Sequence, residues 1–180
     1  MKTTFKIAAL LLLGLLVAIL LSALFVKKEY SVERGITINK PKQAVFDYVK
    51  YLKNQNDFSV WSKIDPGMKQ EFRGTDGTAG FISAWDSENK HAGKGEQEIL
   101  KITDGERIDY EIRFLEPMKS TNNACITFKA VNDSITNVKW SFFGKIKYPV
   151  NLSLVFMDMD AMLGKDLEGG LANLKSITEK

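Results

Sequence analysis

The sequence predicts an α+β domain, in which an antiparallel sheet packs against a long C-terminal helix, preceded by one transmembrane helix. Three observations predict this fold class. An uncharged apolar run lies near the N-terminus, the middle of the chain alternates apolar and polar residues between turn residues, and the last segment repeats leucine at helical spacing. A strand, two short helices, six strands and a long helix follow in that order, which is typical of the α+β class.

The N-terminal run extends from Ile7 to Val26 and contains no charged residue. A helix of this length, at about 1.5 Å per residue, spans the roughly 30 Å hydrocarbon core of a bilayer. A cleaved signal peptide is the alternative, because lysines precede the run. The apolar core of a signal peptide is shorter, however, and ends at a small-residue cleavage site that this run lacks. We therefore expect residues 1–28 to form a retained membrane anchor and residues 29–180 to form the folded domain.

The charges around the run bear on the orientation in the membrane. Lysines lie on both sides of it, so the positive-inside rule does not decide which end faces the cytoplasm. The tail of six residues ahead of the run is typical of a signal anchor whose N-terminus stays in the cytoplasm. We expect a single-pass membrane protein with its domain on the exported side, and the lack of a possible intrachain disulfide is compatible with either side.

Composition excludes several classes of site. Four of the 25 basic residues precede residue 29, which leaves 21 basic residues against 22 acidic ones in the domain. The strongly basic surface of a nucleic-acid-binding protein is therefore absent. A single cysteine, Cys125, excludes a disulfide framework and a Cys-rich zinc module, and a single histidine, His91, excludes sites that need two imidazoles. We expect no metal, no cofactor and no nucleic-acid partner.

The first part of the domain has the pattern of a strand followed by two short helices. Residues 30–38 alternate apolar and polar side chains, and Arg34 interrupts the apolar face. Pro41 then marks a helix start, and apolar residues recur at helical spacing over residues 44–52. A second short helix is expected over residues 54–61.

Six antiparallel strands with one covered face are expected next, separated by turn residues such as Asp104-Gly105. They cover residues 68–73, 80–86, 93–102, 107–114, 122–131 and 136–143. A helix is expected over residues 158–178, where leucine recurs every three or four residues. Gly169-Gly170 inside this helix costs about 1 kcal/mol per glycine, which indicates close backbone packing or a kink.

Three stretches resemble a known superfamily. They are ERGITINKP followed by VFDYV in residues 33–49, FSVWS before Asp65-Pro66, and GKDLEGGLANLK in residues 164–175. They resemble the first strand and helix, a Trp-Ser loop and the terminal helix of the SRPBCC superfamily, which includes START domains and birch-pollen allergens. The match is to its polyketide cyclase/dehydrase and lipid-transport-like branch.

This resemblance implies a helix-grip fold, in which a curved antiparallel sheet wraps round a long C-terminal helix and encloses an apolar ligand cavity. Members of the superfamily bind lipids, sterols, hormones or polyketides, and some catalyse cyclisation or dehydration. The branch has no invariant catalytic set to transfer, so the catalytic residues of this chain stay unassigned.

The resemblance makes inward-facing aromatic residues the best candidates for a ligand site. Each of them alone is typical of a plain hydrophobic core, but a helix-grip fold places some of them around a cavity, together with leucines of the terminal helix. The candidates are Trp61, Trp85, Tyr110, Phe114, Phe128, Trp140, Phe142, Leu163 and Leu167.

Most of the polar candidates have a structural interpretation. His91 lies between two strands, and no carboxylate or nucleophile spacing supports a general base there. Glu96 and Glu98 share a strand face, where paired carboxylates could do acid–base chemistry if buried, but an exposed acidic face is favoured. Cys125 is expected to point away from its inward neighbours and to be structural.

Two further segments lack the spacing of a binding motif. Asp158, Asp160 and Asp166 do not match the ligand positions of a calcium loop, so a metal site is rejected. The glycines of residues 74–80 do not match G-x-G-x-x-G and indicate a hairpin loop. The apolar stretch of residues 148–157 leads to the hypothesis of a cavity lid or a second membrane-facing patch.

The sequence therefore predicts a membrane-tethered domain that binds a hydrophobic small molecule, a lipid or lipid-like compound, in an internal cavity. Two alternatives stay open. One is a cyclase/dehydrase-type enzyme, which needs a polar pair inside the cavity. The other is an accessory domain that binds another protein through an exposed apolar patch.

Overall fold

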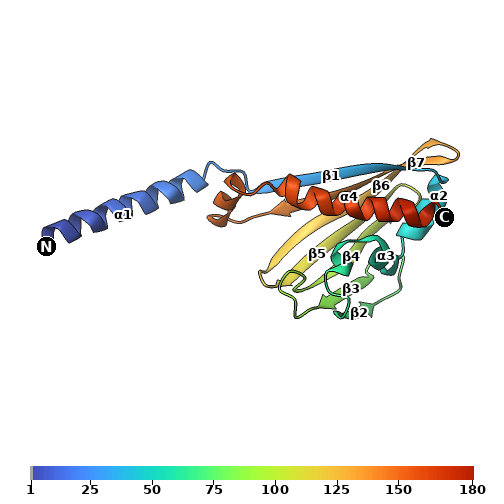
Figure 1. The fold of residues 1–180 in the computed structure, drawn as a ribbon, viewed down its shortest axis with the longest axis horizontal. Coiled ribbons are helices and arrows are strands. Elements are labelled where there is room, and N and C mark those ends of the chain that lie inside the picture. The colour runs from blue at the N-terminus through green and yellow to red at the C-terminus, as the bar shows by residue number, and fades with distance from the viewer. Residues whose placement is uncertain (1) are drawn as a thin grey trace.

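The computed structural model describes residues 2–180 and contains one seven-stranded antiparallel sheet with the order β1-β7-β6-β5-β4-β3-β2 (Figure 1). The strands are β1 Glu29–Ile38, β2 Lys69–Arg73, β3 Ile82–Asp86, β4 Lys94–Thr103, β5 Arg107–Glu116, β6 Ser120–Asn132 and β7 Ile135–Lys145. The α-helices are α1 Lys2–Ala23, α2 Lys42–Val49, α3 Gln55–Phe58 and α4 Met159–Thr178, and three 3-10 turns are η1 Leu52–Asn54, η2 Trp61–Lys63 and η3 Val150–Val155. The predicted α+β class, strands and terminal helix are confirmed.

The second short helix expected over residues 54–61 is present as α3, but it is shorter than expected. The helix α3 ends at Phe58, Ser59 is extended, and a separate 3-10 turn begins at Trp61. Residues two apart on a helix point in nearly opposite directions. The break allows Ser59 and Trp61 to line one wall of the same pocket, an arrangement that a continuous helix would prevent.

The helix α4 lies along β1 (Figure 1) and closes one side of the sheet. Its buried face carries Leu167, Leu171 and Leu174. Gly170 lies on the same face, where an added Cβ would come within 2.7 Å of the Trp140 ring. The close backbone packing predicted for the glycine pair is confirmed at this position.

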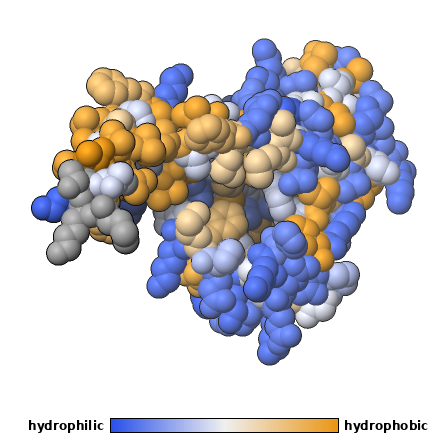
Figure 2. Space-filling model, turned by 60° about the vertical axis from the view of Figure 1, so that its left-hand side comes forward, coloured by the Kyte–Doolittle hydropathy of each residue, from blue (hydrophilic) through white to orange (hydrophobic). Residues whose placement is uncertain are grey.

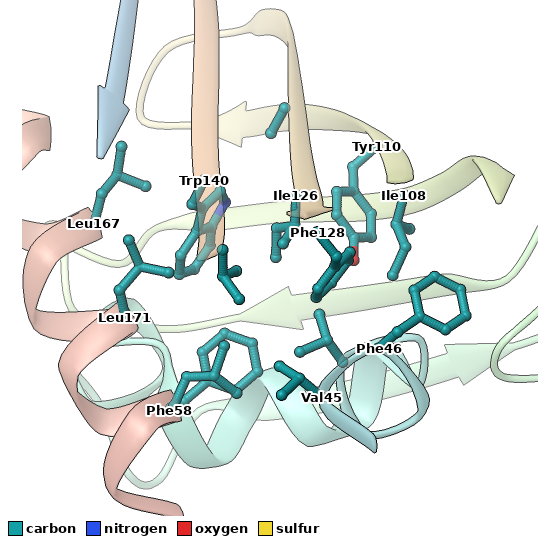
Figure 3. Packing of buried hydrophobic residues seen from close by; sticks show 14 of the residues in the cluster. Val45, Phe46, Phe58, Ile108, Tyr110, Ile126, Phe128, Trp140, Leu167 and Leu171 are labelled. Atoms are coloured by element: carbon teal, nitrogen blue, oxygen red, sulfur yellow. The ribbon is translucent and has the colours of Figure 1, made fainter. Parts of the chain in front are cut away.

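The core lies between the inner face of the sheet and the helices α2, α3 and α4 (Figure 3). Aromatic rings meet edge to face across this layer. The centroids of Phe46 and Phe128 are 5.4 Å apart, and those of Phe58 and Trp140 are 5.7 Å apart. Such contacts stabilise a core beyond the burial of area alone.

Arg34 interrupts the apolar face of β1 because it reaches across to α4. Its guanidinium donates to both carboxylate oxygens of Asp160 at 2.8 Å and to Glu168 at 2.6 Å. Gly164 leaves the space for this group, since a Cβ there would lie 2.1 Å from Nη2 of Arg34. The hydrogen bonds from Arg34 lower the pKa of Asp160, so this carboxylate stays ionised as a partner for Arg34.

The apolar helix α1 extends away from the domain, and the C-terminus lies at the opposite end (Figure 1). Residues Thr4–Ala23 are long and apolar enough to cross a membrane, a property that membrane anchors share with signal sequences. Figure 2 shows the contrast between the orange surface of α1 and the mostly blue surface of the domain.

The C-terminal end of α1 is fixed to η3. The last four carbonyls of a helix have no partner within it, but here each accepts a hydrogen bond. Two accept from amides of the following turn. Tyr148 donates to Leu20 O at 3.3 Å, and the buried Asn151 donates to Ala23 O at 2.7 Å and to Val26 O at 3.0 Å. The domain therefore supplies the capping groups that the end of α1 needs.

Candidate ligand-binding pocket

A pocket of about 300 Å³ lies between the inner face of the sheet, the α3–η2 segment and the start of α4. Ten of its lining side chains are large and apolar or aromatic: Leu52, Trp61, Ile64, Met68, Trp85, Ile112, Phe114, Trp140, Phe142 and Leu163. The others are mostly neutral and polar: Gln55, Asn56, Ser59, Ser62, Gln70, Ser83, His91, Ala92 and Gln97. An apolar wall with a few polar groups is typical of small-molecule sites.

The three tryptophans of the chain form the apolar wall. The Trp61 ring meets the Trp140 ring edge to face, with centroids 5.8 Å apart. Trp85 meets Phe114 in the same way at 5.9 Å. The Trp85 indole lies across Gly95 of the neighbouring strand, where a Cβ would come within 2.4 Å of the ring. A side chain at that position would push the indole out of the wall.

The polar wall consists of two pairs of side-chain amides that join the α3 segment to the sheet. Gln55 and Gln97 exchange hydrogen bonds of 3.3 and 3.1 Å. Asn56 and Gln70 exchange bonds of 3.0 and 3.2 Å. An amide in such a pair keeps a spare donor and acceptor site, so this wall can bind a neutral polar group of a ligand.

No Asp, Glu, Lys, Arg or Cys is among the residues lining this pocket in the described part of the chain. His91 is the one titratable side chain there, and it is exposed at the rim. The pocket therefore offers apolar contact and neutral hydrogen bonds.

Glu96 and Glu98 lie on the face of β4 that points away from the pocket. They are partly exposed there and form ion pairs with arginines. Glu96 accepts from Arg113 at 2.7 Å and also from Arg73, and Glu98 lies 2.8 Å from Arg113. Partial burial raises the pKa of Glu96, but the hydrogen bonds from the two arginines outweigh this effect and the pKa is lowered. A carboxylate held ionised in this way is not a proton donor.

Six of the nine candidate ligand residues line the pocket: Trp61, Trp85, Phe114, Trp140, Phe142 and Leu163. The other three, Tyr110, Phe128 and Leu167, belong to the packed core (Figure 3). Helix α2 covers the sheet at Tyr110 and Phe128. Its residue Phe46 packs edge to face on the Phe128 ring. Burial raises the pKa of the Tyr110 phenol, and its hydroxyl is buried without a hydrogen-bond partner among the described residues.

Sequence reasoning missed the polar wall. Only Gln97 carried a signal, since it shares its strand face with Ile99 and so belongs to the inward side of β4. Gln55, Asn56 and Gln70 come from segments whose partners are distant in the chain. Their pairing depends on tertiary contacts that no local pattern encodes.

The remaining polar candidates have structural roles. Asp158 is the N-cap of α4 and accepts from Ala161 N at 2.9 Å. Asp76, in the loop of residues 74–80, accepts from the backbone amide of Leu52 at 2.7 Å. Cys125 is buried, and burial raises the pKa of its thiol, as expected for an unreactive cysteine.

An antiparallel sheet that closes over a long C-terminal helix, with a mostly apolar pocket between them, defines a helix-grip protein of the SRPBCC superfamily. The chain belongs to the family described as polyketide cyclase / dehydrase and lipid transport, whose model matches residues 29–179. A search of curated proteins gives no significant match.

Three solved structures illustrate the fold. The crystal structure of Ara h 8.0201 has 15% sequence identity and a TM-score of 0.59, over 83% of this chain and 97% of that one. A protein from Chromobacterium violaceum has 13% identity and a TM-score of 0.59, over 83% and 97%. A protein from Thermobifida fusca has 15% identity and a TM-score of 0.57, over 82% and 92%. At such low identity these similarities define the fold alone.

Proposed function

We propose that the protein is a membrane-anchored domain that binds a hydrophobic small molecule, of lipid or lipid-like character, in the pocket between the sheet and α4. The observation that carries this proposal is the pocket itself, with an aromatic wall facing a wall of neutral amides. The family description, which includes lipid transport, supports the same class of ligand.

The volume of the pocket narrows the ligand class. About 300 Å³ is at the lower end of the range of ligand pockets, which runs from about 300 to 1,000 Å³. A space of this size suits one acyl chain or a compact ring system rather than a whole two-chain phospholipid. Transfer of the chain from water is favourable by about 25 cal/mol for each Å² buried, and the amide wall would bind its polar end.

The tryptophans provide the test, because all three line the pocket. The full chain in lipid nanodiscs is titrated with a brominated fatty acid, since bromine quenches indole fluorescence on contact. We expect saturable quenching, with the unbrominated fatty acid as a competitor that reverses it. Quenching that rises linearly without saturation, or no quenching at all, would contradict a ligand site here.

We propose that α1 is retained as a membrane anchor rather than removed as a signal sequence. The contacts of Asn151 support this choice, since its side chain is buried and its amide donates to two carbonyls at the end of α1. Cleavage ahead of the domain would leave that buried donor without partners, at a cost of about 1–3 kcal/mol. The intact mass of the protein from the membrane fraction should be that of the full chain of 20.3 kDa; a shortened mature chain would overturn the proposal.

The orientation proposed from the short N-terminal tail places the domain on the exported side. Protease added to intact cells should then degrade the domain, whereas a cytoplasmic domain would be protected until the membrane is opened. This proposal is independent of the ligand and of the retention of α1.

The enzyme alternative has weaker support. A cyclase or dehydrase needs a proton donor or acceptor at the reacting atoms, and the titratable side chain that the pocket offers is the exposed His91. The protein-binding alternative requires an exposed apolar patch without a cavity. The structure has a pocket, and exposed apolar residues such as Val155 and Phe156 belong to the segment that adjoins α1.

A further inference from the structure

The register of the strands places three connections at one end of the sheet, the end at which the chain passes from α1 into β1. Glu29, at the start of β1, pairs with Lys145 at the end of β7, which leads into η3. The β5–β6 turn and the β3–β4 turn lie at this same end of the sheet. Phe114, near the end of β5, pairs with Ser120 at the start of β6, and Lys94, at the start of β4, pairs with Glu116 at the end of β5. We call this the anchor end of the domain (Figure 1).

The anchor end lies beside the last turn of α1. Tyr148 and Asn151 contact the carbonyls of Leu20 and Ala23, which are the final residues of the apolar segment Thr4–Ala23. When that segment spans a bilayer, its last turn lies at the boundary between hydrocarbon and headgroups. The turn η3 must then lie at the same depth, since its side chains are hydrogen-bonded to that turn.

Several large apolar side chains are exposed near this depth. Phe156 is 83% exposed, Val155 60% and Val150 53%, and Phe25 just after α1 is 90% exposed. On the neighbouring β5–β6 turn Met118 is 65% exposed. Together these five residues form what we call the anchor-end patch. Large apolar side chains left in water at one end of a domain mark a contact surface.

Exposed lysines flank the residues of the anchor-end patch along the chain. Lys27 and Lys28 follow α1, Lys119 follows Met118, and Lys147 precedes η3. All four are exposed and none forms an ion pair within the described residues. Apolar side chains flanked by lysines are typical of surfaces that lie in the interface of a membrane with anionic lipids.

Part of the pocket lining comes from the same end. This part includes His91 and Ala92 of the β3–β4 turn, Phe114 near the end of β5, and Leu163 in the first turns of α4. The connections that carry the anchor-end patch therefore also frame the pocket.

We propose that the anchor end is a second membrane-contact surface, in which η3 and Met118 lie in the headgroup region beside α1 and hold the pocket against the bilayer. A ligand then passes between bilayer and pocket without crossing bulk water. The partner is the lipid bilayer that holds α1. The contact surface rests on the geometry of η3 and α1 together with the proposed anchoring by α1, and the ligand route rests in addition on the proposed ligand site.

The test compares two valines of equal exposure at opposite ends of the sheet. Val155 is 60% exposed in the anchor-end patch, and Val131 is 61% exposed at the far end of β6. Each is replaced in turn, Val155→Cys or Val131→Cys, in a Cys125→Ser background, and labelled with a nitroxide. The full chain is reconstituted in vesicles of phosphatidylcholine and phosphatidylglycerol.

Molecular oxygen concentrates in the bilayer and nickel chelates stay in water, so their relative collision rates with the nitroxide report immersion. We expect oxygen to dominate at position 155 and the nickel chelate to dominate at position 131. Equal, water-like accessibility at both positions would overturn the membrane-contact surface.

The fluorescence titration separates this result from the proposed function. Water-like accessibility at position 155 with intact saturable quenching would refute the contact surface and leave the ligand site standing. Immersion at position 155 without quenching would refute the ligand site and leave the contact surface. A double variant, Val155→Asp with Phe156→Asp, should slow the onset of quenching by brominated fatty acid preloaded in the vesicles more than the onset of quenching by the same fatty acid added from water; an equal effect on both would refute the direct route.

Discussion

Replacing Gly170 by valine is expected to lower the free energy of unfolding by about 3 kcal/mol, at the upper end of the usual cost of overpacking a core. A Cβ at this position would lie 2.7 Å from the Trp140 ring and 3.6 Å from the carbonyl of Phe58. The ring has little room to move, because Phe58 and Trp61 pack against it at 5.7 and 5.8 Å. Helix α4 must therefore move away from the sheet.

The measurement is urea unfolding of the full chain in nanodiscs, followed by near-ultraviolet circular dichroism of the tryptophans. Ser176→Val is the matched control, since residue 176 lies in the same helix and is exposed. Serine and valine have similar helix propensities, so the control adds a valine to α4 without the contact with Trp140 and should change stability by only a few tenths of a kcal/mol. Equal stability losses in the two variants would contradict the packing argument.

Replacing Ser83 by phenylalanine is expected to weaken the binding of brominated fatty acid by about tenfold or more, which corresponds to about 1.4 kcal/mol. Ser83 lines the pocket from β3, so an aromatic ring there would occupy space that the ligand needs. The neighbouring Ala84 pairs with Glu96 on the other face of the sheet and does not line the pocket. Ala84→Phe therefore adds the same ring to the same strand outside the site.

Saturable quenching of tryptophan fluorescence gives the affinity of each variant, and thermal unfolding checks that both remain folded. We expect Ala84→Phe to bind the fatty acid as the unmodified chain does. Equal affinity for Ser83→Phe and Ala84→Phe would mean that the fatty acid binds elsewhere. Loss of binding in both would point to damage to the sheet rather than to a blocked pocket.

Local patterns in the sequence were sufficient to predict most of the fold. Alternation over residues 107–114 predicted β5 Arg107–Glu116, and leucine spacing over residues 158–178 predicted α4 Met159–Thr178. These elements have one covered face, so their periodicity records their burial directly. The segment around Ser59 has no such face, because it turns to present alternate residues to the pocket, and the helix predicted there ends earlier, at Phe58.

The site was less accessible to prediction than the fold. Alternation separates inward from outward residues, but it does not separate side chains that pack together from side chains that border a space. Phe128 and Phe114 both face inward, yet α2 covers the first and the second faces the pocket. From the sequence, Arg34 only interrupted the apolar face of its strand. Its role was not visible there, because its partners Asp160 and Glu168 lie more than 120 residues further along the chain.

The capping of α1 by Tyr148 and Asn151 has a consequence for how cargo could travel. A carrier that moves between two membranes needs a long, flexible linker to its anchor. Here the linker between α1 and β1 is short, and Tyr148 and Asn151 of the domain donate hydrogen bonds to carbonyls at and just after the end of α1. Under the proposed anchoring by α1, the domain stays on the leaflet where it emerges. Delivery to a second membrane would require that membrane, or a mobile acceptor, to come to it.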